Sequence, residues 1–109
     1  MSKWTQNEIK RVLYNAHVVY RDARLTIKTA RTTAPQGRLI AVVPKKIGSA
    51  PERNLIKRRI RALFFEKKFA ETGLDWVFFI KQPIAHVPFS ELSALVDTIA
   101  TKLPIATNP

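Results

Sequence analysis

The order of apolar and polar positions predicts a first helix that begins near residue 5. Thr5 and Glu8 have the spacing of a capping box, and Trp4 and Ile9 occupy the positions of a hydrophobic staple. Apolar residues then recur at i, i+3, i+4 and i+7, the spacing of one helix face. This predicted core-facing stripe consists of Ile9, Val12, Leu13 and Ala16.

Three stretches have strand character. Residues 24–33 alternate between apolar and polar side chains, which predicts a half-buried strand, and residues 34–37 give a turn signal. Residues 39–43 form an apolar run, which predicts a strand buried on both faces. We expect these two strands to form an antiparallel hairpin. Residues 74–80 carry the strongest strand pattern and are too apolar for an edge strand.

Helical periodicity between the last two strands predicts a helix that ends near residue 69. Its apolar stripe lies within about 60° of Ile60 at about 100° per residue. The stripe consists of Ile56, Ile60, Leu63 and Phe64. Strand, helix and strand across residues 39–80 form a βαβ unit, so the two strands should be parallel, with the helix packed on the sheet.

A last helix opens at residues 89–91, and Pro104 ends it. Its core positions are Leu92, Leu95, Val96, Ile99 and Leu103. The predicted order is therefore α-β-β-α-β-α in a single domain over residues 1–109, with a frayed tail at about 104–109.

Basic residues concentrate in residues 45–68. This segment carries nine basic and two acidic side chains, so +7 of the chain's net charge of +11 lies in 24 of its 109 residues. One flank of the helix, about 60° to 160° from Ile60, carries most of the polar groups. These are Asn54, Lys57, Arg58, Arg61 and Lys68, while Arg59 lies on the other flank. One side of the helix can pack on a core while the other offers guanidinium groups to phosphates, so a polyanion is the natural partner.

Composition narrows the class of protein. A pI near 10.6 makes nucleic acid the leading partner class and an anionic membrane surface the second. Cys is absent, which excludes disulfides, thiolate nucleophiles and Cys-ligated zinc. The longest apolar run, residues 76–80, is too short to span a bilayer, and the N-terminus lacks a signal-peptide pattern. We expect a soluble cytoplasmic protein without a membrane role.

Another face of the first helix admits two interpretations. Lys10, Tyr14 and His17 share this face, beside Arg11. One interpretation is an RNA-contact surface on which Tyr14 stacks with a base. The other is an ordinary solvated face with a partly packed Tyr. The sequence leaves both open.

No catalytic or metal site is visible in the sequence. The eight acidic residues form no close cluster; Asp22 and Asp75 could meet in space, but both lie near predicted element ends, where capping explains them. His17 and His86 are far apart, without a third ligand or a nucleophile at motif spacing. We therefore predict no catalytic residues and no metal ligands in the protein itself.

The basic segment closely resembles the bacterial ribonuclease P protein component. The family signature is a Lys-Lys-x-Gly loop followed by a helix that begins Arg-Asn-Arg and continues Ile-Lys-Arg. Here the loop is Lys45 to Gly48, and the helix begins Arg53-Asn54-Leu55 and continues Ile56-Lys57-Arg58, without a gap. The other predicted elements fall in the family's order. The resemblance implies an α+β two-layer sandwich with a mixed sheet and a rare left-handed βαβ crossover.

The resemblance also implies a function. The family's enzyme is a ribonucleoprotein endonuclease that removes the 5′ leader of precursor tRNA, and its catalytic centre and magnesium ions are held mainly by the RNA. The protein alone should not cut precursor tRNA, but it should lower the magnesium requirement of that RNA. The implied contacts to the catalytic RNA are Lys45, Lys46, Arg53, Asn54, Lys57, Arg58 and Arg61. A cleft between the first helix and the sheet would hold the leader, with Lys10, Arg11, Tyr14, Tyr20 and Lys28 as candidate contacts.

Several positions depart from the family pattern. Leu55 replaces an expected Arg, and Arg59 adds a cation where the family often has an apolar residue. Ile9 and Leu13 stand where aromatic residues usually face the leader, and Pro44 stands where a small hydroxyl residue is common. The alternative function is a small structural RNA-binding protein of ribosomal type, which fits the charge but not the contiguous signature. The oligomeric state stays open.

Overall fold

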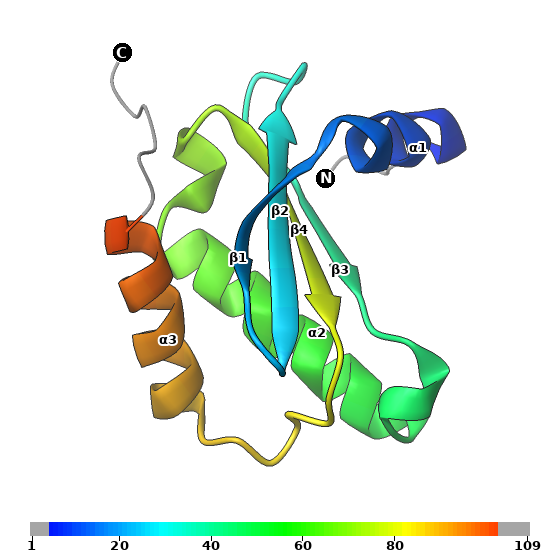
Figure 1. Cartoon of the computed structure of the whole chain (residues 1–109), viewed down its shortest axis with the longest axis vertical. Helices are drawn as coiled ribbons and strands as arrows, with labels where there is room; N and C mark the ends of the chain where they lie inside the picture. The colour runs from blue at the N-terminus through cyan, green and yellow to red at the C-terminus, as the bar shows by residue number, and fades with distance from the viewer. Residues whose placement is uncertain (1–4, 103–109) are drawn as a thin grey trace.

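The protein folds as a four-stranded mixed sheet covered by helices (Figure 1). The computed structural model describes residues 5–102, with side chains through residue 99. The elements in chain order are α1 (Gln6–Asn15), β1 (His17–Arg21), β2 (Leu25–Arg31), β3 (Leu39–Val42), the 3₁₀ turn η1 (Lys45–Ile47), α2 (Ala50–Glu66), the 3₁₀ turn η2 (Phe69–Glu71), β4 (Leu74–Ile80) and α3 (Phe89–Lys102). The α+β class, the mixed sheet and the two terminal helices confirm the predicted fold class.

The strand order is β1-β2-β4-β3, so the predicted hairpin of β2 with β3 is wrong. β2 pairs antiparallel with β1 and β4, and β3 pairs parallel with β4 alone. The segment between β2 and β3 crosses the end of β4 instead of turning back. Gly37 donates its amide to the carbonyl of Ala70 at 2.8 Å, and a Cβ at Gly37 would collide with the carbonyl oxygen of Leu74. A glycine is needed where these two backbones meet.

β1 is a strand that the sequence analysis missed. The predicted helix pattern continued to His17, but α1 ends at Asn15 and Ala16 is extended, at φ −73° and ψ 142°. The next residues, His-Val-Val-Tyr-Arg, contain two adjacent β-branched side chains, which favour a strand. The observed order is therefore α-β-β-β-α-β-α, and His17 lies on β1 rather than beside Tyr14 on the helix.

Some predicted features of α1 are present and others are not. The Thr5–Glu8 capping box is present. Val12 is buried at 6% exposure, but Leu13, predicted to face the core, is 36% exposed. The staple residue Trp4 and the predicted frayed tail at 104–109 lie outside the described residues.

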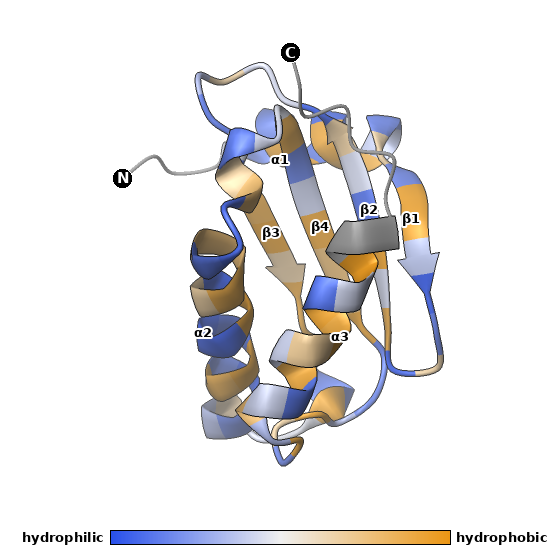
Figure 2. Ribbon diagram, turned by 90° about the vertical axis from the view of Figure 1, so that its left-hand side faces the viewer, coloured by the Kyte–Doolittle hydropathy of each residue, from blue (hydrophilic) through white to orange (hydrophobic). Residues whose placement is uncertain are grey.

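Helices cover the two faces of the sheet unequally (Figures 1 and 2). α2 and α3 pack on one face, and α1 lies across one end of the other. The larger core is on the α2–α3 face, where the whole predicted stripe of α2 is at most 2% exposed. A smaller core, formed by Val12, Ala30 and Val77, joins α1 to the other face. β3 is half-buried throughout, not buried on both faces as predicted, because it is an edge strand.

The connection from β3 through α2 to β4 is left-handed. In Figure 1 both strands point downward, β3 lies to the right of β4, and α2 passes behind the sheet. Figure 2, turned by 90°, also shows α2 on this side of the sheet. Almost all βαβ connections have the opposite hand. The parallel pairing follows from the sequence pattern, whereas the handedness was implied by the family resemblance alone.

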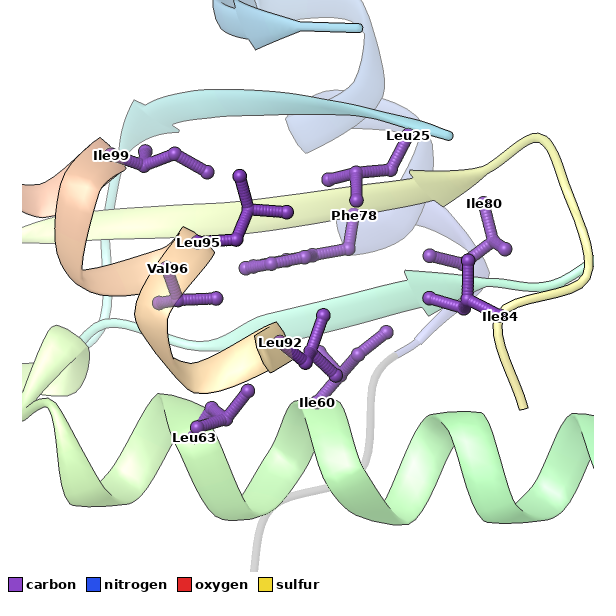
Figure 3. A pocket seen from close by; sticks show the side chains of 10 residues that line it. All are labelled: Leu25, Ile60, Leu63, Phe78, Ile80, Ile84, Leu92, Leu95, Val96 and Ile99. Carbon is purple, nitrogen blue, oxygen red and sulfur yellow. The ribbon is translucent and has the colours of Figure 1, made fainter. Parts of the chain in front are cut away.

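A small apolar cavity lies where α2, α3 and the sheet meet (Figure 3). Its volume is about 10 Å³, room for about one water molecule. Ten side chains line it: Leu25, Ile60, Leu63, Phe78, Ile80, Ile84, Leu92, Leu95, Val96 and Ile99. Because all ten are apolar, the cavity offers no polar group to a ligand and is a packing gap of the core.

Asp22 organises the turn between β1 and β2. Its carboxylate accepts hydrogen bonds from the backbone amides of Arg24 and Leu25, at 2.7 and 3.1 Å, and from the hydroxyl of Tyr20 at 2.7 Å. The guanidinium of Arg24 lies 3.0 Å away. Burial alone would raise the pKa of Asp22, but these hydrogen bonds outweigh it and lower the pKa from 3.8 to about 2. The bond donated to Asp22 also raises the pKa of Tyr20.

The depressed pKa of Asp22 predicts a loss of stability in acid. A carboxylate with a lower pKa in the folded state stabilises the fold above its unfolded pKa, and this stabilisation is lost as the pH falls from about 4 to about 2. We expect Asp22 to contribute up to about 2 kcal/mol to the free energy of unfolding at neutral pH. Urea unfolding of wild type and Asp22→Asn should show a difference that narrows over this pH window. A difference independent of pH would contradict the assignment.

Candidate nucleic-acid interface

The loop before α2 is shaped by the N-terminus of that helix. The Ser49 hydroxyl accepts from the amide of Glu52 at 3.3 Å, and the Ser49 amide donates to the Glu52 carboxylate at 2.9 Å, which completes a capping box. These hydrogen bonds with Ser49 lower the pKa of Glu52. A Cβ at Gly48 would lie 2.5 Å from the Glu52 carboxylate, so a glycine fits this close approach. Ile47, 4% exposed, anchors η1 in the core.

Two basic side chains of η1 therefore stand beside the first turns of α2. Lys45 and Lys46 are exposed on η1, while Ile47 holds the turn in place. Arg53 donates from Nε to the carbonyl of Gly48 at 3.2 Å, which ties α2 back to the loop. Arg53 is half-buried, and at least one of its guanidinium donors serves the fold. His86 lies 3.3 Å from Glu52 and is 87% exposed.

The predicted RNA-contact residues form one surface, which we call the basic face. It consists of Lys45, Lys46, Arg53, Asn54, Lys57, Arg58 and Arg61. Asn54, Arg58 and Arg61 are exposed, and Lys57 is half-buried. Among the described residues, no carboxylate lies within ion-pair distance of any cation of the basic face, whereas Arg24, Arg38 and Lys67 are all paired. The basic face thus carries charge that the described part of the chain does not neutralise.

Arg59 has a structural role that the sequence did not indicate. From the opposite flank of α2, one guanidinium nitrogen of Arg59 donates to the carbonyls of Ala85 and Val87, both at 2.9 Å. These bonds hold the loop between β4 and α3 against α2. Arg59 is therefore not an extra cation of the basic face, and it does not compensate for Leu55.

Replacing Arg59 should lower the stability of the fold but leave the salt dependence of RNA binding unchanged. Arg59→Met keeps the aliphatic stem but leaves the carbonyls of Ala85 and Val87 without this donor. We expect the free energy of unfolding to fall by about 1–3 kcal/mol, the cost of unpaired buried groups. Urea unfolding measures this loss. A salt dependence of RNA binding that changed by as much as in Arg61→Ala would show that Arg59 contacts phosphate after all.

A second surface is the sheet face that α1 covers only in part. Lys28 lies on this face with its ammonium 5.2 Å from the centre of the Phe79 ring. Phe79, Ile40 and Val42 are partly buried around the smaller core. Lys10, Arg11 and Tyr14 project from α1, and Tyr14 is 89% exposed. The aromatic residue of this face, Phe79, was identified in the sequence only as part of a strand.

Tyr20 does not join this surface. It packs against the larger core on the α2–α3 face, and its hydroxyl is bonded to Asp22. The pairing of β1 with β2 shifts register between Val18 and Tyr20, so strict alternation fails there. This bulge explains why Val19 and Tyr20 both pack against the same core.

Arg38 fixes α1 relative to the sheet. Its guanidinium lies 3.2 Å from Glu8 on α1 and 3.2 Å from Asp75 on β4, and its amide donates to Asp75 at 2.9 Å. Asp75 is 1% exposed and needs this partner. Burial lowers and the carboxylates raise the pKa of Arg38, with a net rise. No spacing rule joins residues 8, 38 and 75, so this network could not be predicted from the sequence.

The acidic residues do not form a reactive cluster in the part of the chain that is described. Asp75 pairs in register with Ala30 at one end of β2, whereas Asp22 binds Leu25 at the other end. Within residues 5–99, no three His, Asp or Glu side chains lie close enough together to hold a metal ion. The helices of the described chain are also too short or too polar to cross a membrane.

The chain is similar in sequence to ribonuclease P protein components. The chain is 40% identical over 63 residues to the ribonuclease P protein component of Geobacillus kaustophilus and 38% identical over 63 residues to that of Geobacillus thermodenitrificans. Each match covers 57% of this chain and 52% of the relative, so the chain spans about half the length of the curated relatives it matches.

Solved structures show the same fold at low identity. The RNase P protein of Staphylococcus aureus has a TM-score of 0.77 at 20% identity, covering 94% of both chains. That of Thermotoga maritima has a TM-score of 0.74 at 18% identity, covering 94% of this chain and 99% of its own. The sequence model of the ribonuclease P family matches residues 4–104. The chain therefore belongs to the ribonuclease P protein family.

Proposed function

We propose that this chain is the RNA-binding protein subunit of ribonuclease P. In this role it docks on the catalytic RNA and assists the endonucleolytic removal of the 5′ leader from precursor tRNA. The RNA supplies the catalytic centre and holds the magnesium ions. The protein positions the RNA and offsets its phosphate charge, and none of its side chains takes part in a chemical step.

The observation that carries the proposal is the charge on α2. The stripe of this helix is buried in the sheet core, which fixes the direction in which the opposite side faces. That side, with η1, presents the unpaired cations of the basic face. Guanidinium and ammonium groups bind phosphate oxygens, and the counterions released from RNA favour association. A fixed row of cations on a rigid helix suits a folded RNA better than a small anion.

The partly covered sheet face supports the second half of the proposal, a site for the leader. Single-stranded RNA binds on surfaces that combine cations with aromatic rings. Lys28 and Phe79 provide this combination on the sheet, and Lys10, Arg11 and Tyr14 add exposed groups from α1. The Arg38 network holds α1 in place beside them.

Binding to defined RNAs separates this function from a ribosomal one. We expect purified protein to bind the catalytic RNA of ribonuclease P more tightly than a ribosomal RNA fragment of equal length, measured side by side at one salt concentration. Equal affinities would indicate a general RNA-binding protein. Preference for the ribosomal fragment would favour the structural alternative and contradict the proposal.

A further inference from the structure

Phe65 is an aromatic side chain exposed on the helix that carries the basic face. It is 64% exposed, whereas its neighbour Phe64 is 2% exposed. The two rings meet edge to face, with centroids 5.5 Å apart and planes at 82°. Phe64 in turn packs edge to face on buried Phe69 at 6.2 Å. The exposed ring of Phe65 therefore rests on a buried aromatic cluster formed by Phe64 and Phe69.

The position of Phe65 on α2 places it among cations. At about 100° per residue, Phe65 lies about 40° from Arg61 and about 20° from Arg58, one and two turns earlier. Both arginines are exposed, and no described carboxylate pairs with either. Phe65 thus extends the strip of surface that the basic face presents.

A single exposed apolar residue is common on soluble proteins, and an apolar protein partner would need a wider patch. The neighbours of Phe65 on this strip are charged, so its surroundings suit a ligand that is anionic and also carries flat apolar surfaces. An unpaired nucleotide has both properties: its phosphate meets the guanidinium groups, and its base can stack on the ring.

We propose that Phe65 is a stacking platform for an unpaired base of the RNA that the basic face binds. This inference rests on the proposed function and adds a non-ionic contact to it. Stacking depends on the ring and hardly on salt, whereas the contacts of Arg58 and Arg61 depend on both charge and salt. The two kinds of contact can therefore be told apart in one experiment.

The test measures the affinity of the full chain for the catalytic RNA across a range of KCl concentrations. The variants are Phe65→Leu, which keeps apolar bulk without a ring, and Phe65→Tyr, which keeps the ring. We expect Phe65→Leu to bind roughly tenfold more weakly with an unchanged salt slope, and Phe65→Tyr to bind like wild type. Urea unfolding confirms that both variants fold, as expected for an exposed position.

Wild-type affinity in Phe65→Leu would overturn the proposal, as would an equal loss in Phe65→Tyr. Arg61→Ala, measured alongside, distinguishes a failure of the stacking role of Phe65 from a failure of the proposed function. If Arg61→Ala flattens the salt slope while Phe65→Leu changes nothing, only the stacking role fails. If neither variant changes binding, α2 does not face the RNA and the proposed function of the basic face fails with it.

Discussion

Ile60→Asp is expected to unfold the protein. Ile60 is 2% exposed in the middle of the stripe of α2 and lines the junction of α2 with α3 and the sheet (Figure 3). An aspartate there would bury a charge without a partner and remove apolar contacts. The expected loss is about 5 kcal/mol or more, comparable to the whole stability of a small domain at about 5–15 kcal/mol. Circular dichroism and urea unfolding measure it.

Arg61→Asp is the matched control for this change. It introduces the same side chain at the next residue, but Arg61 is exposed. We expect Arg61→Asp to fold with a stability within about 1 kcal/mol of wild type and to bind RNA poorly, because it reverses a charge on the basic face. A folded Ile60→Asp protein, or an unfolded Arg61→Asp protein, would show that α2 faces the other way.

Removing two cations from the basic face should weaken RNA binding without affecting the fold. In the double variant Arg58→Ala with Arg61→Ala, each lost phosphate contact is expected to reduce the slope of log affinity against log salt by about 1, so the slope should fall by about 2. Binding measured by filter retention from low to moderate KCl gives this slope. The affinity difference from wild type should shrink as salt rises.

Arg21→Ala provides the comparison for this loss of charge. Arg21 is an exposed cation at the end of β1, on the sheet edge opposite β3. Its removal should change the slope much less than either arginine of α2. Equal effects from Arg21 and from the α2 arginines would mean that RNA binding depends on the net charge of the protein alone. The basic face would then have no special role.

The parts of the fold that were predictable follow from periodicity. The stripe of α2, the interior position of β4 and the parallel pairing of β3 with β4 each depend on spacing within one segment or on a short βαβ connection. β1 was not predicted because the helical spacing of apolar residues continues to Ala16, the residue before the strand. A strand of five residues gives too short a pattern to stand out against it. The hairpin of β2 with β3 was wrong because Gly37 serves a close backbone approach rather than a tight turn.

The candidate site was predictable where charge and helix geometry coincide. Arg58 and Arg61 are exposed where the helical arc places them. Arg59 could not be assigned, because its role depends on carbonyls 26 and 28 residues away. The same holds for Arg38, whose partners Glu8 and Asp75 are 30 and 37 residues distant. The position of Tyr20 could not be predicted, because neither β1 nor the bulge that turns Tyr20 toward the larger core was recognised in the sequence.

Cleavage of precursor tRNA at low and at high magnesium tests the central claim most directly. The reactions contain the catalytic RNA alone, the protein alone, or both. We expect the protein alone to leave the substrate intact, the RNA alone to cut it only at high magnesium, and the two together to cut it at low magnesium, because the cations of the basic face relieve phosphate repulsion. Cleavage by the protein alone, or no gain when it is added to the RNA at low magnesium, would contradict the account.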